Sequence, residues 1–161
     1  METHSPPVVQ ALGAAKADPN AGSSNLPLTV AAYYGNLPVL KLLLANGADA
    51  NLNTNVTGII SGIYGLPSNG GNATPLAVAV SQRRAEAVAE LIRAKGDPNG
   101  SLPGGTRLIF GTLYFAPTLK ALLEGGAGPN LRGREDKSPL LCAVEIEGGQ
   151  PGVELLLAHK A

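Results

Sequence analysis

The pattern of apolar and polar positions along the chain repeats in units, and each unit predicts two short helices. In the first complete unit, Ala31 and Ala32 follow Leu28 by three and four positions, which places all three on one face of a helix. Gly35 and Asn36 then predict a turn. A second apolar stripe follows this turn and consists of Val39, Leu40, Leu43 and Leu44.

The units share a register, which predicts a single domain of stacked repeats over residues 1–161. A Pro-Leu or Arg-Leu pair opens every unit except the leading half unit. An asparagine closes every unit except the last, at Asn20, Asn51, Asn99 and Asn130, with spacings of 31, 48 and 31 residues. The predicted unit boundaries are 6–20 for a leading half unit, 26–51, 74–99 and 106–130 for three complete units, and 138–161 for a shortened last unit.

Capping residues mark the ends of the predicted helices. Thr74 and Ser138 are suited to accept hydrogen bonds from the first turn of a helix. A proline follows each of them, at the first helical position, where its missing N–H is harmless. Gly47 is placed to end the second helix in a left-handed conformation.

This pattern resembles the ankyrin repeat, a unit of two antiparallel helices and a β-turn with a T-P-L-H-x-A signature. Residues 35–51, GNLPVLKLLLANGADAN, carry the resemblance most clearly. It implies an all-α solenoid of stacked helix pairs with β-turn fingers. Three departures from the pattern predict a looser stack. The signature histidine is replaced by Thr29, Ala77, Ile109 and Leu141, a helix-ending glycine by Lys95 and Lys160, and an aspartate by Gly128.

A long insertion separates the first complete unit from the second. The step from Asn51 to Pro75 is 24 residues, whereas the corresponding steps elsewhere are 7 to 9 residues. The extra residues lie within 52–73 and predict one long finger loop, and long loops are frequently functional. Its large apolar residues either insert into a partner or fold back over the stack. They are Ile59, Ile60, Ile63, Tyr64 and Leu66.

The resemblance also implies a protein partner on the concave side, against the fingers and the ends of the first helices. Tyrosine is common at binding hot spots, because its ring is large and its hydroxyl forms hydrogen bonds. Phe110 and Phe115 are expected in the core instead. The predicted partner-binding residues are Tyr33, Tyr34, Gln82, Leu113 and Tyr114 on the helices, with Ile59, Ile60, Ile63 and Tyr64 on the finger.

Composition narrows the classes of partner. Lys and Arg number 12, and Asp and Glu number 12, so the net charge is zero and the basic field typical of nucleic-acid binding is missing. Only five charged residues precede residue 81. The single cysteine, Cys142, favours a reducing compartment, and neither a signal peptide nor a membrane span is expected. We therefore expect a cytoplasmic protein that binds no nucleic acid and no membrane.

The sequence offers no catalytic, cofactor or metal site. His4 and His159 lie near opposite ends without ligand neighbours, and Cys142 is expected on a buried helix face. The recurring aspartates and the glycine pairs fit turns. The basic spots Arg83-Arg84 and Arg132, Arg134 and Lys137 are expected to be solvated.

These expectations favour a non-enzymatic module that binds a partner protein through the concave groove and the inserted finger. One alternative is an inhibitor or immunity-type protein that blocks one cognate protein. Another is a structural segment of a longer array. Neither end of the stack carries a polar cap, so self-association through the ends is also expected.

Overall fold

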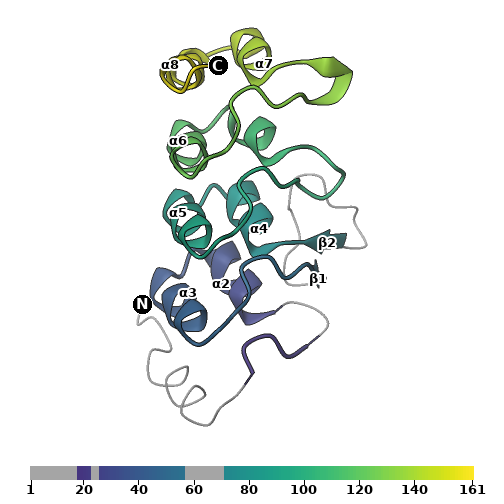
Figure 1. Ribbon diagram of the computed structural model, residues 1–161, viewed down its shortest axis with the longest axis vertical. Coiled ribbons are helices and arrows are strands. Elements are labelled where there is room, and N and C mark those ends of the chain that lie inside the picture. Colours follow the sequence, from purple (N-terminus) through teal and green to yellow (C-terminus); the bar gives the residue numbers. More distant parts are fainter. Residues whose placement is uncertain (1–17, 23–25, 57–70) are drawn as a thin grey trace.

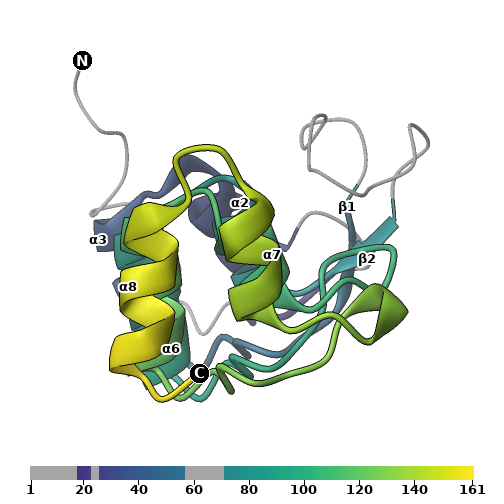
Figure 2. The ribbon, with the colours of Figure 1, turned by 90° about the horizontal axis from the view of Figure 1, so that it is seen from above.

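The computed structural model describes residues 18–22, 26–56 and 71–161 and arranges them as a single file of helix pairs (Figure 1). Seen from above, the front and back helices form two parallel rows, and the connections between repeats project to one side (Figure 2). The predicted solenoid is therefore confirmed. The front row comprises α2 (Pro27–Tyr34), α4 (Pro75–Ser81), the 3₁₀ segment η1 (Leu108–Thr112) and α7 (Pro139–Glu145), and the back row comprises α3 (Leu37–Ala45), α5 (Ala85–Arg93), α6 (Ala116–Glu124) and α8 (Gln150–Ala158).

Side-chain caps begin several of these helices. The Thr74 hydroxyl accepts a hydrogen bond from the N–H of Ala77, and the Ser138 hydroxyl accepts one from Leu141, each at 3.2 Å. The first N–H groups of a helix have no partner within it, so these bonds satisfy donors that would otherwise be unpaired. Both predicted caps are confirmed. Asn36 caps α3 in the same way.

The back helices end in left-handed residues at equivalent positions. Gly47 has a φ of 87° and Gly126 a φ of 93°. Lys95 and Lys160, which stand where those glycines do, also adopt φ values of 67° and 66°. The two lysines therefore keep the geometry of the turn at a cost of about 1 kcal/mol each.

The core divides into two clusters of buried side chains, and the third repeat contributes to both. Its Leu108 and Leu122 belong to the first cluster, which fills the first two repeats. Its Ile109 and Leu119 belong to the second cluster, which reaches Leu156 in the last repeat. The third repeat is therefore the link between the two halves of the stack.

The asparagines that close the repeats tie neighbouring repeats together. The Asn51 amide donates to the Lys95 carbonyl at 2.8 Å, and its Oδ1 accepts from the Asp97 N–H at 3.1 Å. One side chain thus fixes the helix end and the following turn of the next repeat. The bridge recurs, in whole or in part, from Asn20 to Gly47 and Asp49, from Asn99 to Gly128, and from Asn130 to Lys160.

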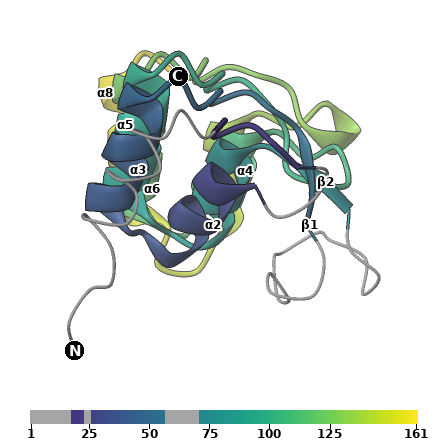
Figure 3. The same cartoon turned by 90° about the horizontal axis from the view of Figure 1, so that it is seen from below.

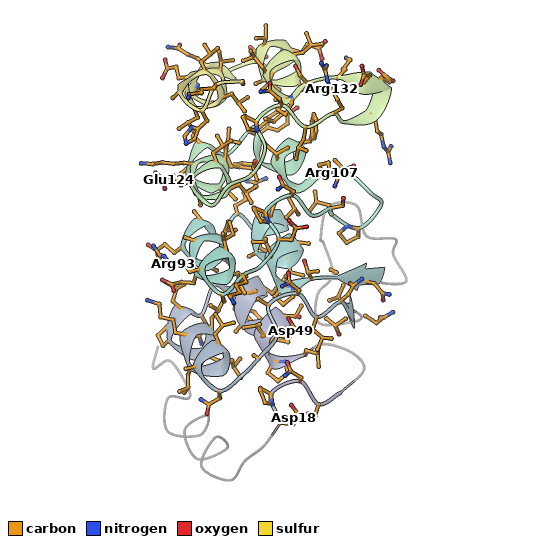
Figure 4. The ribbon with its side chains drawn as sticks, viewed as in Figure 1. Asp18, Asp49, Arg93, Arg107, Glu124 and Arg132 are labelled. Atoms are coloured by element: carbon orange, nitrogen blue, oxygen red, sulfur yellow. The ribbon has the colours of Figure 1, made fainter. Side chains whose placement is uncertain are left out.

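The recurring aspartates form the turns that lead into these asparagines. Asp18 and Asp49 lie in successive turns along the stack (Figure 4). Each accepts a hydrogen bond from the backbone N–H two residues later, at 2.9 and 2.8 Å, and Asp97 repeats the contact. Aspartate side chains stabilise turns in this way. The prediction that these carboxylates are structural is confirmed.

Replacing Asn51 with alanine is expected to lower the free energy of unfolding by about 1–2 kcal/mol, because two hydrogen bonds between repeats are lost. Urea denaturation followed by circular dichroism measures the change. Asn53→Ala is the matched control, since Asn53 is exposed and makes no hydrogen bond to the described residues. Equal losses for the two variants would show that the bridge contributes nothing to stability.

The inserted finger begins and ends as a short antiparallel strand pair, which the sequence pattern did not predict. Strands β1 (Thr54–Val56) and β2 (Gly71–Ala73) pair Thr54 with Ala73 and Val56 with Gly71. Figure 3 shows this pair on the finger side of the stack, beside the front helices. Val56 and Ala73 are buried, so the base of the finger packs on the first core cluster.

Candidate functional site

The third repeat has a shorter front segment than the second, and this changes its conformation. Arg84 follows Thr74 by ten positions, whereas Phe115 follows the equivalent Thr106 by nine. The front element is a 3₁₀ segment there, η1, and it carries Gly111 in its interior. Neither Arg107 nor Thr106 supplies a side-chain cap. The stack consequently loses part of a front helix at this level.

A cavity of about 790 Å³ opens beside η1, between the second and third repeats. It lies at the finger side of the front row. Most of its wall is apolar and aromatic, which is typical of a binding pocket, and its volume lies in the range of such pockets. The lining residues are Ser81, Arg83, Leu102, Pro103, Thr106, Phe110, Gly111, Tyr114 and Phe115.

Three of the predicted partner-binding residues occupy equivalent positions in successive repeats. Tyr34 and Tyr114 are 58% and 68% exposed, and Gln82 between them is half-buried. Tyr33 differs, because its ring packs partly against the first core cluster and meets the Tyr34 ring edge-on at 5.0 Å. Tyr34 and Tyr114 are thus the accessible aromatic residues of this surface, and Tyr33 supports Tyr34.

The prediction that Leu113 faces the groove is corrected by the structure. Leu113 is only 4% exposed and belongs to the second core cluster. The shortened front segment turns it inward, where it packs with Leu119 and Ala143. The predicted finger residues Ile59, Ile60, Ile63 and Tyr64 lie outside the described residues.

Phe110 and Phe115 were expected in the core. Phe110 does pack against the second core cluster, Phe115 belongs to neither cluster, and both line the cavity. Each is half-buried. A Cβ on Gly133 would come within 2.6 Å of the Phe110 ring, so the fourth finger holds this ring in place. The missing residue before Phe115 was visible in the sequence and is the signal that could have identified this site.

Arg83 and Arg84 are exposed, as expected, and they also connect three repeats. The Arg84 guanidinium donates from Nε to the Tyr33 carbonyl at 3.2 Å, across the boundary to the first repeat. The Arg83 guanidinium carbon lies 3.6 Å from the centroid of the Phe115 ring, across the boundary to the third repeat. A cation above an aromatic face is an attractive arrangement.

The basic residues of the fourth finger are likewise bonded. Arg134 donates to the Gly104 carbonyl of the third finger at 3.2 Å, and Lys137 reaches the Glu145 carboxylate at 3.0 Å. This hydrogen bond, with the attraction of the Glu145 charge, raises the pKa of the Lys137 ammonium. Arg132 contacts Asp136. These cations therefore stabilise the finger and its contact with α7.

The last repeat exposes apolar side chains on its outer side. Leu141, Val144 and Leu157 are 48%, 65% and 56% exposed. Ile109 and Thr112, the equivalents of Leu141 and Val144 in the third repeat, are buried, and α7 packs against the η1 segment that carries them. Self-association through this surface stays a prediction.

Within residues 18–22, 26–56 and 71–161, no group of three histidine, cysteine or acidic side chains is arranged to hold a metal ion. Cys142 is half-buried and packs against the second core cluster. In this part of the chain no helix has the length and apolar character needed to cross a membrane.

Comparison with known proteins agrees with this architecture. The sequence profile described as "Ankyrin repeats (3 copies)" matches residues 2–101. The crystal structure of an ankyrin repeat domain from Acinetobacter baumannii superposes with a TM-score of 0.72 at 25% sequence identity, over 93% of this chain and 73% of that one. No curated protein matches the sequence. Ankyrin repeats are in general protein–protein interaction modules without catalytic activity. The chain belongs to the ankyrin-repeat family.

Proposed function

We propose that this chain binds a partner protein through its concave surface, formed by the ends of the front helices and by the fingers. The observation that carries the proposal is the pair of exposed tyrosines, Tyr34 and Tyr114, at equivalent positions two repeats apart. Large aromatic side chains left in contact with water are unfavourable unless another surface covers them, and tyrosine is enriched at binding hot spots.

The surface around these tyrosines is held rigidly, which lowers the entropy lost on binding. The carbonyl of Tyr33 is fixed by Arg84 from the next repeat. Tyr114 lies beside Phe115, with ring centroids 6.4 Å apart, and Phe115 is in turn covered by Arg83. The tyrosines are therefore presented on a stack whose repeats are already linked.

The inserted finger forms the second part of the proposed binding surface. Its β1–β2 stem lies beside the front row (Figure 3). Ile59, Ile60, Ile63 and Tyr64 supply four large apolar side chains in this short segment. We propose that they contact the same partner as Tyr34 and Tyr114.

Site-directed photo-cross-linking in the native host tests this proposal. A benzoylphenylalanine residue in place of Tyr34 or Tyr114 is expected to give one discrete protein adduct, the same from both positions. The matched controls replace Lys41 on α3 and Lys120 on α6, whose side chains are 58% and 59% exposed on the back row. Equal adduct yields from front and back positions, or none from the front, would contradict the proposal.

The finger is tested in the same experiment with a shortened chain. Since Val56 pairs with Gly71, a two-residue Asn-Gly turn can join the strands directly in place of residues 57–70. We expect unchanged helical circular dichroism and a lower yield of the Tyr34 adduct. A loss of helical signal would instead identify the finger as a structural cover.

A further inference from the structure

The cavity beside η1 is lined by an exposed cation that makes no hydrogen bond within the described part of the chain. All six arginines of the chain lie within the described residues. Arg84, Arg93, Arg107, Arg132 and Arg134 each make a hydrogen bond. Arg83, which lines the cavity, makes no hydrogen bond or ion pair with the described part of the chain.

The backbone of Arg83 is strained in a way that the equivalent repeats avoid. Arg83 has a φ of 58°, whereas Gly35 and Gly148, which occupy the same turn in other repeats, have φ values of 68° and 75°. A non-glycine residue in this region costs about 1 kcal/mol. Strained residues cluster at functional sites, where the side chain is needed despite the cost.

The guanidinium is oriented by the ring beneath it. Its carbon lies 3.6 Å from the Phe115 centroid, so the guanidinium sits over one face of the ring. An arginine stacked in this way keeps the N–H groups at its edges available, and their fork matches the two oxygens of a carboxylate. The cavity lining includes no aspartate or glutamate that could occupy this fork.

The rest of the cavity is suited to an apolar side chain. Phe110 is held by Gly133 on one side and faces the cavity on the other. Leu102 is fixed in the third finger by a hydrogen bond from its N–H to the Thr106 carbonyl at 2.7 Å. A Cβ on Gly111 would lie 2.7 Å from Leu102 Cδ1, so the absence of a side chain there lets Leu102 pack directly against the backbone of η1.

We infer that this cavity binds a segment of the partner in which a bulky apolar side chain is flanked by a carboxylate. The apolar group enters between Phe110 and Phe115, and the carboxylate pairs with Arg83. The inference rests on the proposed function and specifies the chemistry of its partner. Nucleic acid fits less well, because a phosphate backbone needs several cations and the lining supplies one.

Nuclear magnetic resonance titration of the intact, isotope-labelled chain with short peptides tests this directly. Acetyl-Glu-Leu-Phe-Glu-amide is expected to shift the amide signals of Phe110, Gly111 and Phe115. The neutral acetyl-Gln-Leu-Phe-Gln-amide should bind about tenfold more weakly, since hydrogen bonds to charged groups contribute more than neutral ones. Acetyl-Glu-Ala-Ala-Glu-amide should also bind more weakly, because it lacks the apolar group.

Arg83→Gly is the decisive variant, because glycine relieves the backbone strain while removing the guanidinium. The variant should therefore stay folded and lose the preference for the acidic peptide. Arg93→Gln removes an exposed arginine from the back of α5 and should leave binding unchanged. The inference is overturned if the acidic peptide causes no shifts, if Arg83→Gly retains the preference, or if an oligothymidylate binds more tightly than the peptide.

The two proposals can fail separately. The peptide titration needs no partner protein, whereas the cross-linking experiment needs no peptide. An adduct at Tyr34 and Tyr114 with no peptide binding would retain the interaction surface and remove the cavity from it. Peptide binding without front-row adducts would retain the cavity as a binding site and remove the tyrosine surface.

Discussion

Replacing Leu91 with alanine is expected to lower the free energy of unfolding by about 3 kcal/mol, the effect of a buried leucine whose cavity cannot collapse. Leu91 is fully buried in α5. Helix α5 packs against α3 on one side and α6 on the other. Since each repeat is stabilised by its neighbours, a cavity at this level weakens two interfaces at once.

Urea denaturation monitored by helical circular dichroism measures the loss. Leu157→Ala makes the same chemical change in the last repeat, at a side chain that is 56% exposed. It should lower the free energy of unfolding by less than about 0.5 kcal/mol. Similar losses for the two leucines would mean that the central interface is not better packed than the end of the stack.

The features that the sequence predicted well are those set by residues within one repeat. Thr74 and Ser138 sit immediately before a proline and an apolar stripe, and their hydroxyls reach N–H groups three residues later. Gly47 follows the stripe and adopts the left-handed conformation. In each case the partner is a near neighbour in sequence, so spacing and residue type were sufficient.

The features that the sequence did not predict depend on contacts between repeats. Arg83 and Arg84 are adjacent and look equivalent, but one contacts Phe115 and the other contacts Tyr33. Leu113 stands in register with Ser81, the residue before Gln82, yet the missing residue of its repeat turns it inward. Aligning the repeats assumes that all copies share the same conformation. The third repeat does not, because its front element is the 3₁₀ segment η1 and not an α-helix.

The signature histidine position shows how a substitution is accommodated. Its replacements Ala77 and Ile109 are buried and apolar. Thr29 is buried too, and its hydroxyl has no hydrogen-bond partner among the described residues. In the first repeat the replacement therefore leaves an unsatisfied buried polar group, which costs stability.

A substitution in the turn between α7 and α8 is expected to destabilise the protein about as much as the Leu91 substitution. Gly148 and Gly149 are adjacent but have different roles. Gly148 has a φ of 75° and open space around its Cα, so alanine there should cost about 1 kcal/mol from backbone strain alone. Gly149 has an ordinary φ of −71°, but a Cβ would collide with the Ala143 carbonyl oxygen and lie 2.9 Å from that of Ile146.

Gly149→Ala is therefore expected to lower the free energy of unfolding of the last repeat by about 3 kcal/mol, because backbone atoms cannot move aside as a side chain can. Hydrogen exchange resolves where the loss falls. The amides of α7 and α8 should lose protection while those of α4 and α5 keep it, since the last repeat lies at one end of a linear stack. If Gly148→Ala had the larger effect, backbone conformation rather than close packing would control this turn.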